Sequence, residues 1–130
     1  MRTSPHIIDK IAPWECFVFG SNLAGIHGAG AAKLALGWGA KHGYGIGQCG
    51  NTFAIPTKDA SIVTMPLDAI RPYVSRFYLW AQSSPEWTYL VTEIGCGLAG
   101  YQPKDIAPLF GKRFLELGNV HLPERFIQHL

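Results

Sequence analysis

The fold is decided by one stretch of the chain: Phe17-Val18-Phe19-Gly20-Ser21-Asn22, then Gly25-Ile26-His27-Gly28-Ala29-Gly30, then Ala31-Ala32-Lys33-Leu34-Ala35-Leu36. Residues 15–20 form a short, mainly apolar run in which polar and apolar residues do not alternate. This predicts a strand that is buried on both faces and ends at Gly20. The third run consists of strong helix formers, and Gly37 is expected to end that helix. Ser21 and Asn22 have side chains that cap helices. The stretch therefore predicts a strand, a glycine-rich loop and a helix in direct succession.

A second unit of the same design lies nearer the end of the chain. Residues 89–94 predict a strand, residues 95–101 a loop, and residues 105–117 a helix with one apolar face. Its strand and loop read Tyr89-Leu90-Val91-Thr92-Glu93-Ile94 and Gly95-Cys96-Gly97-Leu98-Ala99-Gly100-Tyr101. The loop again joins the end of a strand to the start of a helix.

The remaining segments continue the alternation of strands and helices. Residues 43–50 predict a flexible loop, and Thr52-Phe53-Ala54-Ile55 a strand closed by Pro56. A helix is expected from Asp68, as its N-cap, to about Gln82, and a last strand at 119–122 before a short turn of helix. Residues 62–65 fit either a minor strand or a buried connection. This alternation predicts an α/β fold, in three α/β/α layers around a mixed, mostly parallel sheet.

Length and composition favour one soluble domain. The 130 residues suit a single core, so we expect one domain over 1–130, with 1–13 as an N-terminal arm laid across the surface. Hydrophobic residues at 48% and charged residues at 15% exclude a disordered chain. No apolar run approaches the ~20 residues of a membrane helix, and the N-terminus lacks the features of a signal peptide, so a cytoplasmic protein is expected. Three cysteines without a CxxC pair, and histidines without helical spacing, predict neither a metal site nor a cofactor held by one.

The charge is weak in total but uneven along the chain. A net charge of +2 is too small to indicate nucleic-acid binding. Between Glu15 and Asp59 there is no acidic residue, and ten of the fifteen glycines lie there. An anion can approach such a segment closely.

The two glycine-rich loops predict a phosphate site. In an open parallel sheet, ligands bind at the carboxyl ends of the strands, where both loops would lie. Backbone N–H groups at such loops favour phosphate, and glycine lets the backbone approach the ligand. Two loops together indicate a diphosphate held from both sides. A P-loop is excluded because Ala31 and Ala32 stand where Lys and Ser/Thr would be required, and the Rossmann spacing fails as well. The alternative is that these glycines only allow tight turns between strands and helices, and that the loops bind no ligand.

In these loops the chain resembles the macro domains, the α/β/α family that binds ADP-ribose, and most of all their compact phage- and prophage-encoded macro-like members. The resemblance covers residues 16–117. It is carried by Phe19-Gly20-Ser21-Asn22, by Gly25 to Ala32, by Ile94 to Tyr101, and by Ala54-Ile55-Pro56-Thr57-Lys58-Asp59.

The resemblance implies a small-molecule ligand, ADP-ribose or a related nucleotide diphosphate, and an ADP-ribosylated protein as a further partner. Asn22 would contact the distal ribose, the loop before the helix would donate N–H groups, the second loop would wrap the diphosphate, and Tyr101 would pack on sugar or base. The ligand-binding set is then Gly20, Ser21, Asn22, Gly28, Ala29, Gly30, Gly95, Cys96, Gly97, Leu98, Ala99, Gly100 and Tyr101.

The catalytic groups of macro-domain hydrolases have no counterpart here. Alanine stands at the corresponding positions, Ala29, Ala31, Ala32 and Ala99, and no early Gly-Asp segment is present to read adenine. Catalysis would have to use His27, Asn22, Asp59 or Glu93, with Lys58 as a further candidate. Two hypotheses follow. The protein hydrolyses an ADP-ribosyl ester or ADP-ribose 1''-phosphate, or it is a non-catalytic reader or sequestering module for such a ligand.

Overall fold

The computed structural model describes residues 3–130. Within that range the elements are β1 (Thr3–Ser4), β2 (Glu15–Asn22), α1 (Gly30–Ala35), η1 (Leu36–Trp38), β3 (Gly47–Cys49), β4 (Thr52–Lys58), α2 (Leu67–Gln82), β5 (Thr88–Val91), α3 (Pro103–Phe110), η2 (Lys112–Glu116), β6 (Val120–Pro123) and α4 (Glu124–Ile127), where η denotes a 3₁₀ helix.

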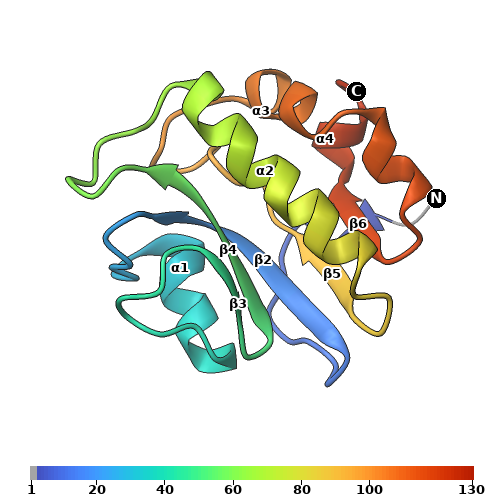
Figure 1. Ribbon diagram of the computed structural model, residues 1–130, viewed down its shortest axis with the longest axis horizontal. Helices are drawn as coiled ribbons and strands as arrows, with labels where there is room; N and C mark the ends of the chain where they lie inside the picture. The colour runs from blue at the N-terminus through green and yellow to red at the C-terminus, as the bar shows by residue number, and fades with distance from the viewer. Residues whose placement is uncertain (1–2) are drawn as a thin grey trace.

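The strands form one sheet in the order β1-β6-β5-β2-β4-β3. Every neighbouring pair is parallel except β3 and β4, which are antiparallel. Figure 1 shows α1 on one face of the sheet and α2, α3 and α4 on the other. The protein is therefore a three-layer α/β/α structure around a mixed, mostly parallel sheet, which confirms the predicted fold class.

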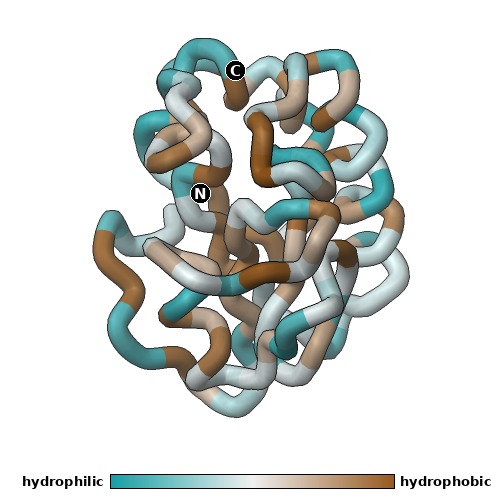
Figure 2. The backbone as a smooth tube through the Cα atoms, turned by 90° about the vertical axis from the view of Figure 1, so that its left-hand side faces the viewer, coloured by the Kyte–Doolittle hydropathy of each residue, from teal (hydrophilic) through white to brown (hydrophobic). Residues whose placement is uncertain are grey.

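The central strand β2 separates two apolar cores. Cys16 and Val18 belong to the larger core under α2 and α3, and Phe17 and Phe19 to the smaller core under α1. All four are at most 1% exposed, so the strand is buried on both faces, as its unbroken apolar run predicted. In the side view of Figure 2, hydrophobic stretches run through the middle of the molecule and also lie on several outer loops.

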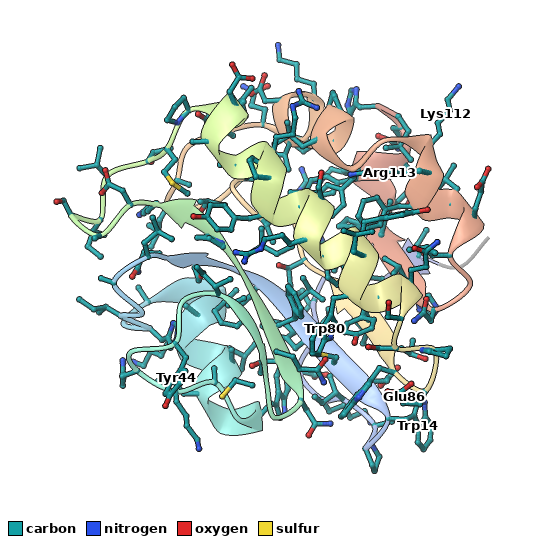
Figure 3. All side chains as sticks on the ribbon, in the orientation of Figure 1. Trp14, Tyr44, Trp80, Glu86, Lys112 and Arg113 are labelled. Atoms are coloured by element: carbon teal, nitrogen blue, oxygen red, sulfur yellow. The ribbon has the colours of Figure 1, made fainter. Side chains whose placement is uncertain are left out.

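The larger core is built mainly from aromatic rings. The Phe77 ring centroid lies 4.9 Å from that of Phe53, 5.4 Å from Tyr89 and 5.8 Å from Phe114. Burial raises the pKa of Tyr89 to about 12, and its hydroxyl donates a hydrogen bond to Gln48 on the sheet edge. At the surface, the Arg113 guanidinium, labelled in Figure 3, covers the Tyr78 ring at 4.6 Å from its centroid.

Two segments expected to be irregular are edge strands. Thr3–Ser4, inside the predicted arm, pairs with β6 as β1, and the Ser4 hydroxyl donates to the Val91 carbonyl at 2.6 Å. Residues 1–2 of that arm lie outside the described residues. Gly47–Cys49, inside the predicted loop, pairs with β4 as β3. Both strands are too short to show the alternation that identifies a strand in a sequence.

The ends of three of the four inner strands also differ from the prediction. β2 continues through Ser21 and Asn22, which therefore pair with β4 and do not cap α1; its N-cap is Ala29. β4 runs through Pro56 to Lys58. β3 covers only residues 52–54 of β4, so Pro56 lies at an uncovered edge that tolerates a missing N–H, and Lys58 beyond it forms an antiparallel bridge with Thr64. β5 ends at Val91, three residues earlier than predicted.

Two predicted helices have different limits. α2 begins at Leu67, so Asp68 lies in its first turn rather than at the N-cap, which is Pro66. The helix predicted over 105–117 is α3 followed by the 3₁₀ segment η2, because Gly111 between them adopts a φ of +75° that a helix cannot contain. Among residues 3–130, no helix has both the length and the apolar character needed to span a bilayer.

Candidate functional site

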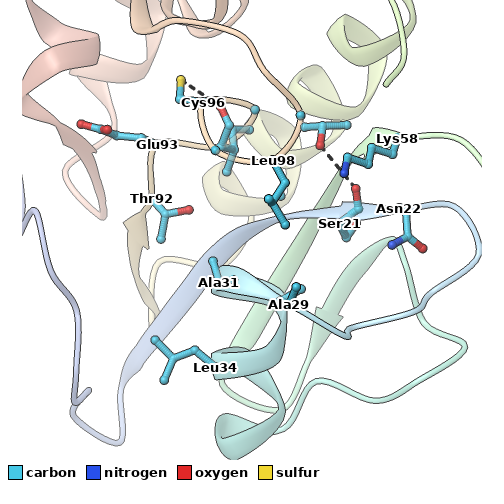
Figure 4. A pocket seen from close by; sticks show the side chains of 18 of the residues that line it. Ser21, Asn22, Ala29, Ala31, Leu34, Lys58, Thr92, Glu93, Cys96 and Leu98 are labelled. Atoms are coloured by element: carbon cyan, nitrogen blue, oxygen red, sulfur yellow. Dashed lines mark hydrogen bonds between the residues drawn. The ribbon is translucent and has the colours of Figure 1, made fainter. Parts of the chain in front are cut away.

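A cleft of about 760 Å³ opens at the carboxyl ends of β2, β4 and β5. Residues 28–32, at the start of α1, line one side and residues 92–99 the other (Figure 4). This volume lies in the range of small-molecule and cofactor sites. The parallel strands bring together two loops that are far apart in the sequence, as the topology of the sheet predicted.

Asn22 closes the turn at the end of β2. Its side-chain amide donates to the Ile26 carbonyl at 2.8 Å, and its side-chain oxygen accepts from the Ile26 N–H at 3.0 Å. The residue lines the cleft but is only 8% exposed. Both polar atoms of the side chain therefore shape the loop, and one amide hydrogen is left over for a ligand.

The first loop leaves backbone donors unused. The N–H groups of Gly28, Ala29 and Gly30 have no acceptor among the described residues, although all three residues are exposed and line the cleft. A Cβ added at Gly28 would meet nothing closer than Ile26 Cγ2 at 4.0 Å, so the space beside this glycine is open.

The second loop has the same property. Its ends are tied by a bond from the Tyr101 N–H to the Gly95 carbonyl at 2.8 Å, while the N–H groups of Gly97, Leu98 and Ala99 find no acceptor within residues 3–130. The Ala99 carbonyl accepts from the Thr64 hydroxyl at 3.0 Å, which fixes the loop in place. Two sets of residues with free N–H groups therefore line one cleft, an arrangement that favours anions.

The charged groups at the cleft add to this preference. Lys58, at the end of β4, lines the cleft and makes no ion pair in the described part of the chain. Among the described residues, Glu93 supplies the one carboxylate of the lining, and Arg125 neutralises it with bonds of 2.7 Å from Nε and 2.5 Å from Nη2. That pairing raises the pKa of Arg125. Figure 4 shows the Glu93 carboxylate directed away from the first loop.

The structure separates the four predicted catalytic residues. Asn22 and Glu93 line the cleft, with their polar atoms engaged as described. Asp59 does not line it; its carboxylate accepts the N–H groups of Ser61 and Val63 at 2.9 and 3.1 Å and so holds a surface turn.

His27 lies in the smaller core and not in the cleft. The residue is 1% exposed, with its ring 5.4 Å from that of Phe19. Its Nε2 donates to the carbonyls of Lys41 and Tyr44 at 2.9 and 3.2 Å, and its Nδ1 has no partner among the described atoms. Because both acceptors are carbonyls, the proton is on Nε2. His27 therefore ties the first loop to the segment of residues 41–44. Its ring has no access to a ligand in the cleft.

The predicted ligand-binding residues mostly meet at the cleft. Two of them do not: Gly100 and Tyr101 lie outside the lining, and the Tyr101 hydroxyl donates to the Met65 carbonyl at 2.7 Å. The other eleven line it: Gly20, Ser21, Asn22, Gly28, Ala29, Gly30, Gly95, Cys96, Gly97, Leu98 and Ala99.

Apart from Leu98, which was among the predicted ligand-binding residues, sequence reasoning missed the apolar rim of the cleft. Five aliphatic side chains that line it are 42–76% exposed, namely Ile7, Ile26, Leu34, Ile62 and Leu98. They come from separate segments, so no periodic pattern marks them. Thr57 and Thr92 were missed as well, because the ends of β4 and β5 were misplaced.

Cys96 lines the cleft as a protonated thiol. Burial, and to a smaller extent the Glu93 carboxylate, raises its pKa to about 11, and the thiol donates to the Ile94 carbonyl at 3.5 Å. No group of three or more His, Cys, Asp or Glu side chains within residues 3–130 could hold a metal ion.

We expect iodoacetamide at pH 8 to alkylate Cys96 about tenfold more slowly than glutathione. The raised pKa lowers the thiolate fraction roughly a hundredfold, and the greater nucleophilicity of a more basic thiolate offsets part of that loss. Peptide mapping by mass spectrometry over time measures the rate at each cysteine. Alkylation as fast as that of glutathione would show an activated thiol and contradict the prediction.

Comparison with known proteins adds no relative. No family model, curated protein or solved structure matches this chain.

Proposed function

We propose that the protein binds ADP-ribose, or a closely related nucleotide diphosphate, in this cleft and does not hydrolyse it. The observation that carries the proposal is the pair of loops, 28–30 and 97–99, whose backbone N–H groups lack acceptors in the described structure and flank one cavity. Six donors on two sides suit a diphosphate better than a single phosphate, because each phosphate group can be bound by one loop.

The electrostatics of the cleft support an anionic ligand. Lys58 contributes a positive charge without a competing carboxylate, since Glu93 is held by Arg125. The net charge of the chain is only +2, so attraction comes from local donors rather than from the overall field. A ligand whose charge is confined to its diphosphate fits this distribution.

The apolar rim supports a ligand with rings beyond the phosphates. The exposed side chains of Ile26, Leu34 and Leu98 line the same cavity as the donors. Aliphatic surfaces of this kind pack against the faces of a sugar or a base. Among diphosphates with such groups, the resemblance of both loops to macro domains favours ADP-ribose.

Binding without turnover is favoured because the candidate histidine and both candidate carboxylates are engaged elsewhere. A general base must reach the attacking water directly or through one further water. His27 is buried beneath the cleft, Asp59 holds a turn outside it, and Glu93 is paired with Arg125. The protein would then act as a reader or sequestering module for its ligand.

Calorimetric titration with ADP-ribose, followed by an assay for turnover, tests the proposal. We expect one ligand per chain, with no phosphate released from ADP-ribose 1''-phosphate and no ADP-ribose released from an ADP-ribosylated protein. Release of either product would establish the hydrolase alternative. No detectable binding of ADP-ribose would overturn the proposal.

A further inference from the structure

Ile62 has an unusual backbone conformation at the edge of the cleft. Its φ is +61°, and it is the one residue other than glycine with a positive φ within residues 3–130. The left-handed region is unfavourable for any side chain and most of all for a β-branched one. Such strain persists only where the surrounding structure enforces it, and it is concentrated at ligand-binding positions.

Hydrogen bonds around Asp59 enforce this conformation. The Asp59 carboxylate accepts the N–H groups of Ser61 and Val63, and the Ile62 N–H donates to the Asp59 carbonyl at 3.1 Å. The Asp59 N–H closes the turn by donating to the Val63 carbonyl at 2.8 Å. The next residue, Thr64, is bonded to Ala99 of the second loop. The turn is thus fixed internally and attached to one wall of the cleft.

The result of this conformation is the position of one aliphatic side chain. Ile62 lines the cleft, where Leu98 and Ile26 are also exposed, and it remains 42% exposed itself. Val63, the next residue, is 58% exposed and does not line the cleft. An asparagine or glycine would adopt the same backbone at less cost, so the conformation of the turn does not account for an isoleucine here.

We infer that Ile62 is a specificity-determining residue that packs on the non-phosphate part of the ligand, a ribose or base face. The inference rests on the proposed function and extends it, because it assigns an apolar contact to a residue outside the two phosphate loops. The strained turn places Ile62 at the cleft before the ligand arrives, so the contact requires little reordering of the protein on binding.

The experiment compares Ile62→Asn with Val63→Asn in calorimetric titration against ADP-ribose and in thermal unfolding. Asparagine is similar in size, polar, and tolerant of the left-handed region. For Ile62→Asn we expect the Kd to rise about tenfold, as for partial loss of a buried aliphatic contact, with Tm unchanged or higher. Ile62→Leu, which keeps the apolar surface, and Val63→Asn should each hold the Kd within about twofold of wild type.

Each outcome decides the matter. A Kd for Ile62→Asn equal to that of wild type would overturn this inference and leave ADP-ribose binding intact. A fall in Tm of several degrees for Ile62→Asn would also overturn it, by showing that Ile62 serves the fold. Failure of the wild-type protein to bind ADP-ribose would overturn the proposed function itself, and this inference with it.

Discussion

Replacing Gly28 with glutamate should raise the Kd for ADP-ribose at least about a hundredfold. The new carboxylate would lie beside the unpaired N–H groups of the first loop, where the proposed diphosphate is bound. Two like charges within a few ångströms in a partly desolvated cleft repel by several kcal/mol. Gly28 has no positive φ, and the nearest atom to an added Cβ is 4.0 Å away, so the backbone accepts the change.

Gly37→Glu is the matched control. Gly37 lies in η1 outside the cleft, has no positive φ, and has no atom within 4 Å of an added Cβ. The Gly37→Glu substitution introduces the same charge on the same side of the sheet. The Kd of this variant for ADP-ribose should remain within about twofold of wild type. Calorimetry measures the affinities, and circular dichroism checks that both variants are folded. Equal affinity of Gly28→Glu and wild type would place the diphosphate away from the first loop.

The position of the cleft could be predicted because it depends on topology. Two glycine-rich loops, each following an apolar strand, must lie at the same edge once those strands are parallel neighbours. β2 and β5 are such neighbours, with Val18 opposite Val91. The three layers were predictable for a similar reason, since β2 is apolar at consecutive positions and therefore needs cover on both faces.

The roles of individual polar residues could not be predicted, because they depend on the partner that each side chain finds in the folded chain. The Glu93 carboxylate is occupied by Arg125, which lies 32 residues further on. The His27 ring is occupied by the carbonyls of residues 41 and 44. Asp59 is occupied by its own turn, and the left-handed Ile62 within that turn has no signature in the sequence. The sequence identifies the chemistry available; only the fold decides which groups remain free.

The loop that contains Gly45 packs against the backbone of the turn at Asn22, and this packing depends on one close approach, at Gly45. A Cβ at this buried position would overlap the Asn22 carbonyl oxygen and lie 3.3 Å from the Gly25 nitrogen, both of which are backbone atoms. Gly45 has no positive φ, so the conflict is purely steric. Its carbonyl also accepts the Ser21 hydroxyl at 2.5 Å, so displacement of the loop would weaken that bond as well.

We therefore expect Gly45→Ala to lower the free energy of unfolding by about 3 kcal/mol, the upper part of the range for overpacking a tight site. Urea denaturation measures the change. Gly118→Ala is the control: its Cβ would meet nothing within 4 Å, it has no positive φ, and its effect should stay within about 0.5 kcal/mol. Affinity for ADP-ribose should fall for Gly45→Ala in conditions where the variant is folded, because the Asn22 turn shapes the cleft and rests on Gly45. If Gly45→Ala were as stable as Gly118→Ala, the loop that contains Gly45 would be shown to move away from the turn at Asn22 at no cost in free energy. The inference that Gly45 supports this turn would then be wrong.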